Sequence, residues 1–196
     1  MKKLPLLLMG LVFLMACNNA TDTQQEAKSE PAQQEAVKPQ LTKAVAKEAK
    51  PAKVDKANSL VNWMSFEEAQ KKVAESPRKI IVDVYTGWCG PCKMMDSYTF
   101  NNEEVAAFID KNFYAVKFNA ESGDPVTFKD KVYENPKYDP NRGARRRNAP
   151  HQLTQTMGLR GYPTIVVYDP QLNIIQRIVG FKKPEQLMPI LNQLAS

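Results

Sequence analysis

Two cysteines separated by two residues, Cys89 and Cys92, are the side chains of this sequence with the clearest capacity for chemistry. They follow a β-branched apolar run at residues 80–85 and precede a stretch that is expected to be helical through residue 98. Cysteines three positions apart at a helix N-terminus face the same side and can form a disulfide. The helix dipole favours a thiolate on the first sulfur. We therefore expect Cys89 to be an exposed nucleophile and Cys92 to be the deeper, resolving thiol.

Two other uses of a Cys-x-x-Cys pair are disfavoured by the neighbouring residues. Covalent haem attachment requires a histidine directly after the second cysteine, and Lys93 stands there. A structural zinc site needs two more ligands, and the rest of the chain offers only Cys17 and His151. His151 follows Pro150 at an expected helix start and is interpreted as a structural or surface residue. We predict no metal and no cofactor beyond the redox-active disulfide itself.

The elements that position these cysteines can be read from local patterns. Residues 80–85 are typical of a strand buried on both faces, as central strands of α/β sheets are. Asp83 interrupts this strand, and a buried carboxylate must be paired or have a shifted pKa. We expect its pKa to be raised by burial. Upstream, Ser65 followed three residues later by Glu68 is a capping box that predicts a short helix over residues 66–73.

Residues 88–93, Trp-Cys-Gly-Pro-Cys-Lys, reproduce the active-site signature of the thioredoxin superfamily, and the resemblance extends beyond them. Asp83 stands six residues before Cys89, where this family keeps a buried acid. Lys117, in an expected strand at residues 113–119, matches the lysine beside that acid. Residues 160–164 match the loop that holds a cis-proline opposite the disulfide. The sequence is identified as a member of this superfamily, which implies an α/β fold with a central mixed sheet flanked by helices.

The resemblance also implies roles for individual residues. Those with a catalytic role would be Cys89, Cys92, Asp83, Lys117 and Pro163. Those that contact the substrate would be Trp88, Gly90, Pro91 and Tyr162. The stretch from Cys92 to Val105 looks like the periplasmic thioredoxin-like domain of DsbD-type disulfide reductases, and Gly-Pro between the cysteines resembles the reducing members of the superfamily. The implied activity is thiol–disulfide exchange, with protein disulfides as substrates and a membrane thiol as electron donor.

Three other functions remain open at this point. The same dithiol could serve a disulfide oxidase or isomerase, and a measured reduction potential separates these from a reductase. A peroxide-reducing thiol enzyme has no supporting feature beyond the reactive cysteine. A binding lipoprotein could use the fold as a scaffold with incidental cysteines, although the combination of Cys89, Cys92, Asp83 and Pro163 argues against it.

The N-terminal part of the chain has a different composition. Lys2 and Lys3 precede an apolar run that ends at Ala16 and is shorter than the roughly 20 residues that a bilayer-crossing helix needs. The run ends in Leu-Met-Ala-Cys, which resembles a bacterial lipobox. We predict a signal peptide at residues 1–16, a lipidated Cys17 and a periplasm-facing anchor in the bacterial cell envelope; an ordinary signal peptide is the alternative. Residues 17–58, rich in Ala, Gln, Lys and Pro, are expected to be a disordered tether to a domain at 59–196.

Residues 123–148 form an insertion before the expected cis-proline loop. Residues 126–133 could make a hairpin, and the insertion ends in three consecutive arginines at 145–147. These are interpreted as a solvated loop, or alternatively as a surface for an anionic partner or phospholipid headgroups. The net charge of +6 over 196 residues is too small to indicate a nucleic-acid partner. We expect the insertion to select the protein partner, since the dithiol chemistry is generic.

Overall fold

The computed structural model describes residues 59–143 and 145–196. The predicted signal peptide at 1–16 and the predicted tether at 17–58, including Cys17, lie outside the described residues. In the part of the chain that the structure describes, no helix is long and apolar enough to span a bilayer.

The centre of the domain is a four-stranded mixed sheet in the order β2-β1-β5-β6. Strand β1 pairs in parallel with β2 and antiparallel with β5, which in turn pairs antiparallel with β6. The strands span Lys79–Tyr85 (β1), Phe113–Asn119 (β2), Thr164–Tyr168 (β5) and Ile174–Val179 (β6). The predicted strands at 80–85 and 113–119 are both present, and the predicted mixed α/β fold is confirmed.

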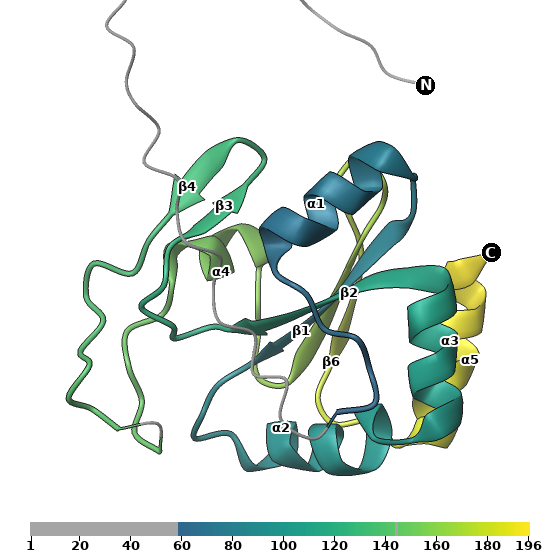
Figure 1. Cartoon of the computed structure of the whole chain (residues 1–196). Helices are drawn as coiled ribbons and strands as arrows, with labels where there is room; N and C mark the ends of the chain where they lie inside the picture. Colours follow the sequence, from purple (N-terminus) through teal and green to yellow (C-terminus); the bar gives the residue numbers. More distant parts are fainter. Residues whose placement is uncertain (1–58, 144) are drawn as a thin grey trace, which may run out of the picture. The chain divides into compact units, whose positions relative to one another are not determined.

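Helices cover both faces of this sheet (Figure 1). The helices span Phe66–Glu75 (α1), Gly90–Met94 (α2), Glu103–Asn112 (α3), Gln152–Met157 (α4) and Pro184–Ala195 (α5), and α2 continues into a π-helical segment, η1 (Met95–Phe100). Helix α1 begins where the sequence predicts, because the Ser65 hydroxyl accepts a hydrogen bond from the backbone N–H of Glu68. The helical stretch after the cysteines extends two residues beyond the predicted end.

The alternation of side chains along β1 divides the core into two layers. Ile80, Val82 and Val84 face α1 and α4, whereas Ile81 faces α3 and α5. Side chains two positions apart in a strand point to the same face, so Asp83 points into the layer of Ile81. The carboxylate of Asp83 therefore lies in the core layer that also contains the buried side chains of η1, the segment that follows α2.

The insertion contains the predicted hairpin, formed by β3 (Val126–Phe128) and β4 (Lys131–Tyr133). Lys129 and Asp130 both have positive φ, as a tight two-residue hairpin turn requires. The hairpin is part of the domain core and not a separable appendage. The ring of Phe128 contacts those of Phe66 and Tyr168 edge to face, and Val126 is also buried.

Candidate active site

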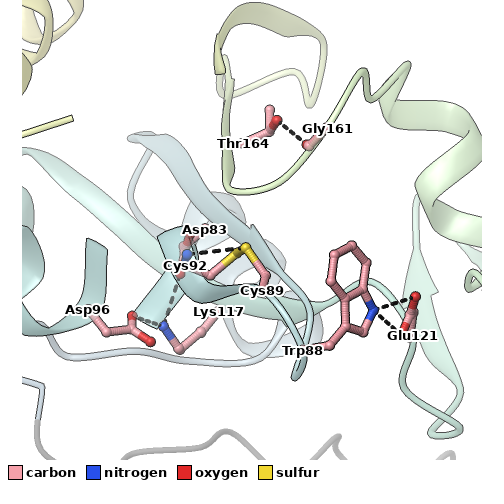
Figure 2. Close-up of a disulfide and its surroundings, with 9 residues drawn as sticks. All are labelled: Asp83, Trp88, Cys89, Cys92, Asp96, Lys117, Glu121, Gly161 and Thr164. Atoms are coloured by element: carbon pink, nitrogen blue, oxygen red, sulfur yellow. Dashed lines mark hydrogen bonds and ion pairs between the residues drawn. A yellow bond between two sulfur atoms is a disulfide. The ribbon is translucent and has the colours of Figure 1, made fainter. Parts of the chain in front are cut away.

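The two cysteines lie at the N-terminus of α2 and form a disulfide (Figure 2). Cys89 is the N-cap residue, and its sulfur accepts a hydrogen bond from the backbone N–H of Cys92 at 3.1 Å. Pro91 stands in the first turn, where its missing N–H costs no helical hydrogen bond. The fold thus directs a backbone donor of the helix N-terminus at the sulfur predicted to be the nucleophile.

The exposure of the cysteines differs from the sequence-based expectation. Cys89 and Cys92 are each only 3% exposed, so the prediction of an exposed Cys89 is wrong in this disulfide form. The neighbours explain the difference, since half-buried Trp88 precedes Cys89 and the loop before Thr164 lies beside the end of β1. Gly90 and Pro91 are exposed between the two buried cysteines. A partner would therefore meet these two residues before it reached the sulfurs.

Asp83 and Lys117 form an ion pair beside the disulfide (Figure 2). The two residues are directly opposite each other in the β1–β2 register, which puts both side chains on the same face of the sheet. The Nζ atom of Lys117 lies 2.9 Å from Oδ2 of Asp83, and their side chains are 6% and 2% exposed. Both charges are thus removed from water, and Lys117 is the only cation within ion-pair distance of Asp83 among the described residues.

Lys117 has a second carboxylate partner, Asp96, which the sequence-based interpretation did not include. Figure 2 shows the Lys117 amine between Asp83 and Asp96. Asp96 lies in η1, one helical turn after Cys92, and its side chain is 36% exposed. Lys117 therefore connects a fully buried acid to one that reaches solvent.

Burial and neighbouring charges shift the pKa values of Asp83 and Lys117. Burial raises the pKa of Asp83 above its ordinary value, the nearby Asp96 carboxylate adds to the rise, and the Lys117 amine opposes it. Burial lowers the pKa of Lys117, but the two carboxylates outweigh that effect and the net direction is upward. Asp83 and Asp96 thus both favour the charged form of Lys117. The raised pKa expected for Asp83 is present.

One oxygen of the Asp83 carboxylate is left without a protein partner. Among the described residues, Oδ1 is buried and has no hydrogen-bond donor, whereas Oδ2 bonds Lys117. A cavity of about 600 Å³ lies on this side of the disulfide and is lined by Cys92, Asp96 and Lys117, among others. A cavity of this size with polar walls can hold water. Cys92, Lys117 and Asp96 thus border one polar cavity, and Asp83 lies behind it in contact with Lys117.

The loop before β5 supplies the proline that the sequence predicts beside the disulfide. The Tyr162–Pro163 peptide bond is cis. The hydroxyl of Thr164 donates to the carbonyl of Gly161 at 2.7 Å and closes the loop on itself. The ring of Tyr162 approaches that of Trp88 edge to face, with 6.1 Å between the ring centroids. The cis-proline loop and the residue that precedes the first cysteine thus share one rim of the site.

Trp88 is also fixed from the side of the insertion. Its indole N–H donates to both carboxylate oxygens of Glu121, at 3.0 and 2.9 Å. The same carboxylate accepts a hydrogen bond from the backbone N–H of Asn148, the last residue of the insertion. The guanidinium carbon of Arg147 lies 4.4 Å from the centroid of the Trp88 ring. The sequence-based interpretation did not include Glu121, and it named Arg147 only as part of the arginine run, because neither residue lies near Cys89 in sequence.

His151 lies away from this chemistry, as the sequence-based interpretation proposed. Its side chain is fully buried and accepts the N–H of Leu153 through Nδ1, so it is the N-cap of α4. Its Nε2 lies 3.1 Å from the carbonyl oxygen of Asp124 and donates to it. Both ring nitrogens therefore have backbone partners, and the histidine connects α4 to the start of the insertion.

The fold and this site together define a class of protein. A mixed sheet flanked by helices, a cysteine pair capping a helix and a cis-proline beside that pair are typical of thiol–disulfide oxidoreductases of the thioredoxin type. A family model described as a thioredoxin-like domain matches residues 66–195. The chain belongs to this thioredoxin-like family of thiol–disulfide oxidoreductases.

Individual relatives are similar over the same domain. The chain is 25% identical over 122 residues to the thiol:disulfide interchange protein DsbD of Photorhabdus laumondii, a match that covers 61% of this chain and 17% of DsbD. The DsbD of Haemophilus influenzae is 28% identical over 118 residues, covering 59% of this chain and 16% of that protein. The chain thus spans about a sixth of the length of these relatives. Among solved structures, the reduced C-terminal domain of Neisseria meningitidis DsbD is similar, with a TM-score of 0.43 and 22% identity, over 65% of this chain and 90% of that domain.

Proposed function

We propose that this protein reduces disulfides of other proteins in the bacterial cell envelope through the Cys89–Cys92 dithiol. The observation that carries this proposal is that the cysteine pair at the N-terminus of α2 lies close both to the buried Asp83–Lys117 pair and to the cis-proline loop, whose Tyr162 contacts Trp88 (Figure 2). A scaffold that used the fold only for binding would have no need of a buried carboxylate next to a cysteine pair, because burying a charge costs free energy.

The exchange proceeds in two displacements. The Cys89 thiolate attacks one sulfur of the substrate disulfide, so that a bond from Cys89 to that sulfur forms, the substrate S–S bond breaks and the first substrate thiolate leaves. Asp83 then accepts the proton of Cys92 through water, and the Cys92 thiolate attacks the sulfur of Cys89. The second substrate thiolate leaves as the Cys89–Cys92 bond closes. Two electrons have passed to the substrate, and no other cofactor is consumed.

The raised pKa of Asp83 suits this role. A general base works best when its pKa lies near the ambient pH, and burial moves a carboxyl pKa in that direction. Lys117 limits the rise and Asp96 connects the trio to solvent, so the proton taken from Cys92 has a route out of the site. In this mechanism Lys117 and Asp96 are positioning residues.

Restoring the dithiol requires electrons from outside the protein. A dithiol donor in the membrane would reduce Cys89–Cys92 by the same exchange run in reverse. The likeness to proteins named thiol:disulfide interchange protein supports a donor and an acceptor that are both thiol proteins. The N-terminal sequence supports a lipid anchor at Cys17, with the domain facing the periplasm.

The decisive experiment is to trap the mixed disulfide with Cys92→Ser in the full chain. Without the resolving thiol, the first displacement stalls and the partner stays bound through Cys89. We expect a covalent complex that dithiothreitol releases. The matched control is the double variant Cys89→Ser/Cys92→Ser, which should trap nothing. Absence of any complex from envelope extracts, together with no reduction of a peptide disulfide by the wild type, would overturn the proposal.

The direction of exchange needs a separate measurement. A reduction potential close to that of thioredoxin, about −270 mV, supports a reductase, whereas a value near −120 mV would indicate an oxidase. Equilibration of the full chain with glutathione redox buffers, read from the fraction of oxidised Cys89–Cys92, gives this number.

A further inference from the structure

The arginine run of the insertion reaches the rim of the active site through Arg147 and through Arg146, which lines a pocket with Gly87 and Glu121. Arg147 packs on Trp88, the residue before Cys89, and Asn148 is bonded to the same Glu121 carboxylate that holds the Trp88 indole. Three contacts therefore join the end of the insertion to the approach to the disulfide. Any charge carried by this part of the insertion acts on whatever approaches Cys89.

The segment that carries the arginines is held in place by its own hydrogen bonds. The side-chain amide of Asn148 donates to the carbonyl of Asp139, and the N–H of Asp139 donates back to the Asn148 side chain. Arg142 donates to the carbonyl of Arg147. Nearby, the ring of Tyr138 covers Gly123 so closely that a Cβ there would meet it at 2.4 Å. The arginines are thus presented from a folded segment.

The positive charge of this segment is concentrated and largely uncompensated. Four of the seven arginines of the chain fall within residues 142–147, and all four side chains are exposed. Arg142 pairs with Asp139 at 3.4 Å. Within residues 59–143 and 145–196, no carboxylate lies within ion-pair distance of Arg145, Arg146 or Arg147. Such a cluster is complementary to an anionic surface on another molecule.

We propose that Arg145, Arg146 and Arg147 form a docking surface for an acidic polypeptide segment next to the substrate disulfide. The inference rests on the proposed exchange function and specifies its substrate class. The planar guanidinium group pairs with carboxylates in a bidentate manner, which favours arginine over lysine at recognition surfaces. Arg147 stacks on Trp88, so an acidic segment held here belongs to the same molecule as the disulfide that Cys89 attacks. A flat membrane on Arg147 would cover Trp88 and exclude a protein disulfide.

The test compares three disulfide-bridged peptides that differ only in four flanking residues: aspartate, serine or lysine. The reduced full chain is mixed with each peptide, and the second-order rate constant is measured by stopped flow from tryptophan fluorescence. At low ionic strength we expect the aspartate peptide to react roughly tenfold faster than the serine peptide, and the lysine peptide more slowly. The differences should collapse at about 1 M salt, where the Debye length is about 3 Å.

Charge variants connect this preference to the arginines. Arg145→Glu/Arg146→Glu should invert the order of the three peptides, and Arg145→Gln/Arg146→Gln, which keeps Arg147, should clearly narrow the differences among their rates. The readout is the ratio of the rate constants of one variant on the three peptides. A change in the overall activity or in the folded fraction of that variant leaves this ratio unchanged. The matched control, Lys71→Glu/Lys131→Glu, makes the same change in net charge on α1 and β4, which lie away from α2 in Figure 1, and should keep the wild-type order.

The outcomes separate this inference from the function on which it rests. If no peptide is reduced, the exchange function itself fails. If all three are reduced at equal rates at low salt, the exchange function stands and the docking surface is overturned. Equal rates combined with binding to phosphatidylglycerol vesicles that the Arg145→Gln/Arg146→Gln variant loses would assign the arginines to a membrane and also overturn the proposal.

Discussion

The Nζ atom of Lys117 lies 2.9 Å from Oδ2 of Asp83, at paired positions of the parallel strands β1 and β2 and almost out of contact with solvent. This pair is expensive to bury, and its position next to a cysteine pair rather than at the surface connects it to the exchange chemistry. The remaining oxygen of Asp83 has no donor among the described residues.

Asp83→Asn should stabilise the protein at neutral pH. The pKa of Asp83 is raised above 3.8 in the folded protein by burial, so between 3.8 and that raised value the folded state binds more protons than the unfolded state. Stability from this group therefore falls as pH rises, and a neutral side chain removes the loss. We expect the free energy of unfolding, measured with urea, to rise by about 0.5–2 kcal/mol at pH 8. The rise should become smaller towards pH 4. Glu134→Gln at an exposed site should change nothing. A less stable Asp83→Asn at pH 8 would show that the ion pair is net favourable.

Asp96→Asn and Lys117→Met should shift the pH dependence of the second displacement in opposite directions. The Asp96 carboxylate raises the pKa of Asp83 and the Lys117 amine lowers it. Removing Asp96 thus moves the acidic limb of the rate to lower pH, whereas removing Lys117 moves it to higher pH. The rate of resolution of a preformed mixed disulfide, measured against pH, reports both shifts. Asp83→Asn should abolish this limb and slow the step at least about tenfold at pH 7. Parallel shifts in the two variants would exclude Asp83 as the base.

His151 should make the fold sensitive to mild acid. Burial lowers its pKa below 6.5, only partly offset by the hydrogen bond to the Asp124 carbonyl. Below pH 6.5 the unfolded state takes up a proton that the folded state resists, so stability falls as pH falls through this range. His151→Asn, which keeps an acceptor for the cap, should cost about 1 kcal/mol at pH 7.5 but flatten the stability between pH 6.5 and 5. Thermal unfolding of both proteins across that range measures the difference, and equal slopes would contradict the assignment.

Phe128→Ala tests the structural role of the hairpin in the insertion separately from the proposed docking role of the arginines. Phe128 is 3% exposed and contacts two core rings, so its truncation should cost about 3–5 kcal/mol in urea unfolding. Reduction of a neutral peptide disulfide, per folded molecule, should not change. Replacing residues 140–146 with a Gly-Ser linker should do the reverse: little loss of stability and loss of the preference among charged peptides. A marginal effect of Phe128→Ala on unfolding would show that the hairpin is dispensable.

The N-terminal prediction concerns residues outside the described part of the chain. We expect residues 1–16 to be removed and Cys17 to be acylated, because a short apolar run ends at an Ala-Cys junction. Mass spectrometry of the mature N-terminus in a bacterial host checks this directly, with Cys17→Ser as the control that should leave the membrane fraction. An N-terminus elsewhere, or an unmodified Cys17, would remove the anchor from the proposed function.

Local patterns in the sequence were sufficient for much of the fold. The strand at 80–85, the start of α1 at Ser65 and the hairpin turn at Lys129 and Asp130 follow from side-chain patterning, capping and turn chemistry. These features depend on residues within a few positions of one another. The spacing of Cys89 and Cys92 is also a local feature of this kind, since it spans only four residues. The strand at 113–119 follows from the resemblance to thioredoxins.

Only the tertiary structure decided which distant residues share the site. Asp96 is predictable in hindsight from its position one turn after Cys92, but its contact with Lys117 depends on how η1 packs over β2. The contacts of Glu121 and Arg147 with Trp88 join segments that no periodicity connects, and the burial of Cys89 depends on its neighbours in space. Sequence alone therefore determined the reactive cysteine pair, because Cys89 and Cys92 lie within one helical turn of each other. The environment that tunes it and the surface that selects its partner arise from packing between segments far apart in the chain.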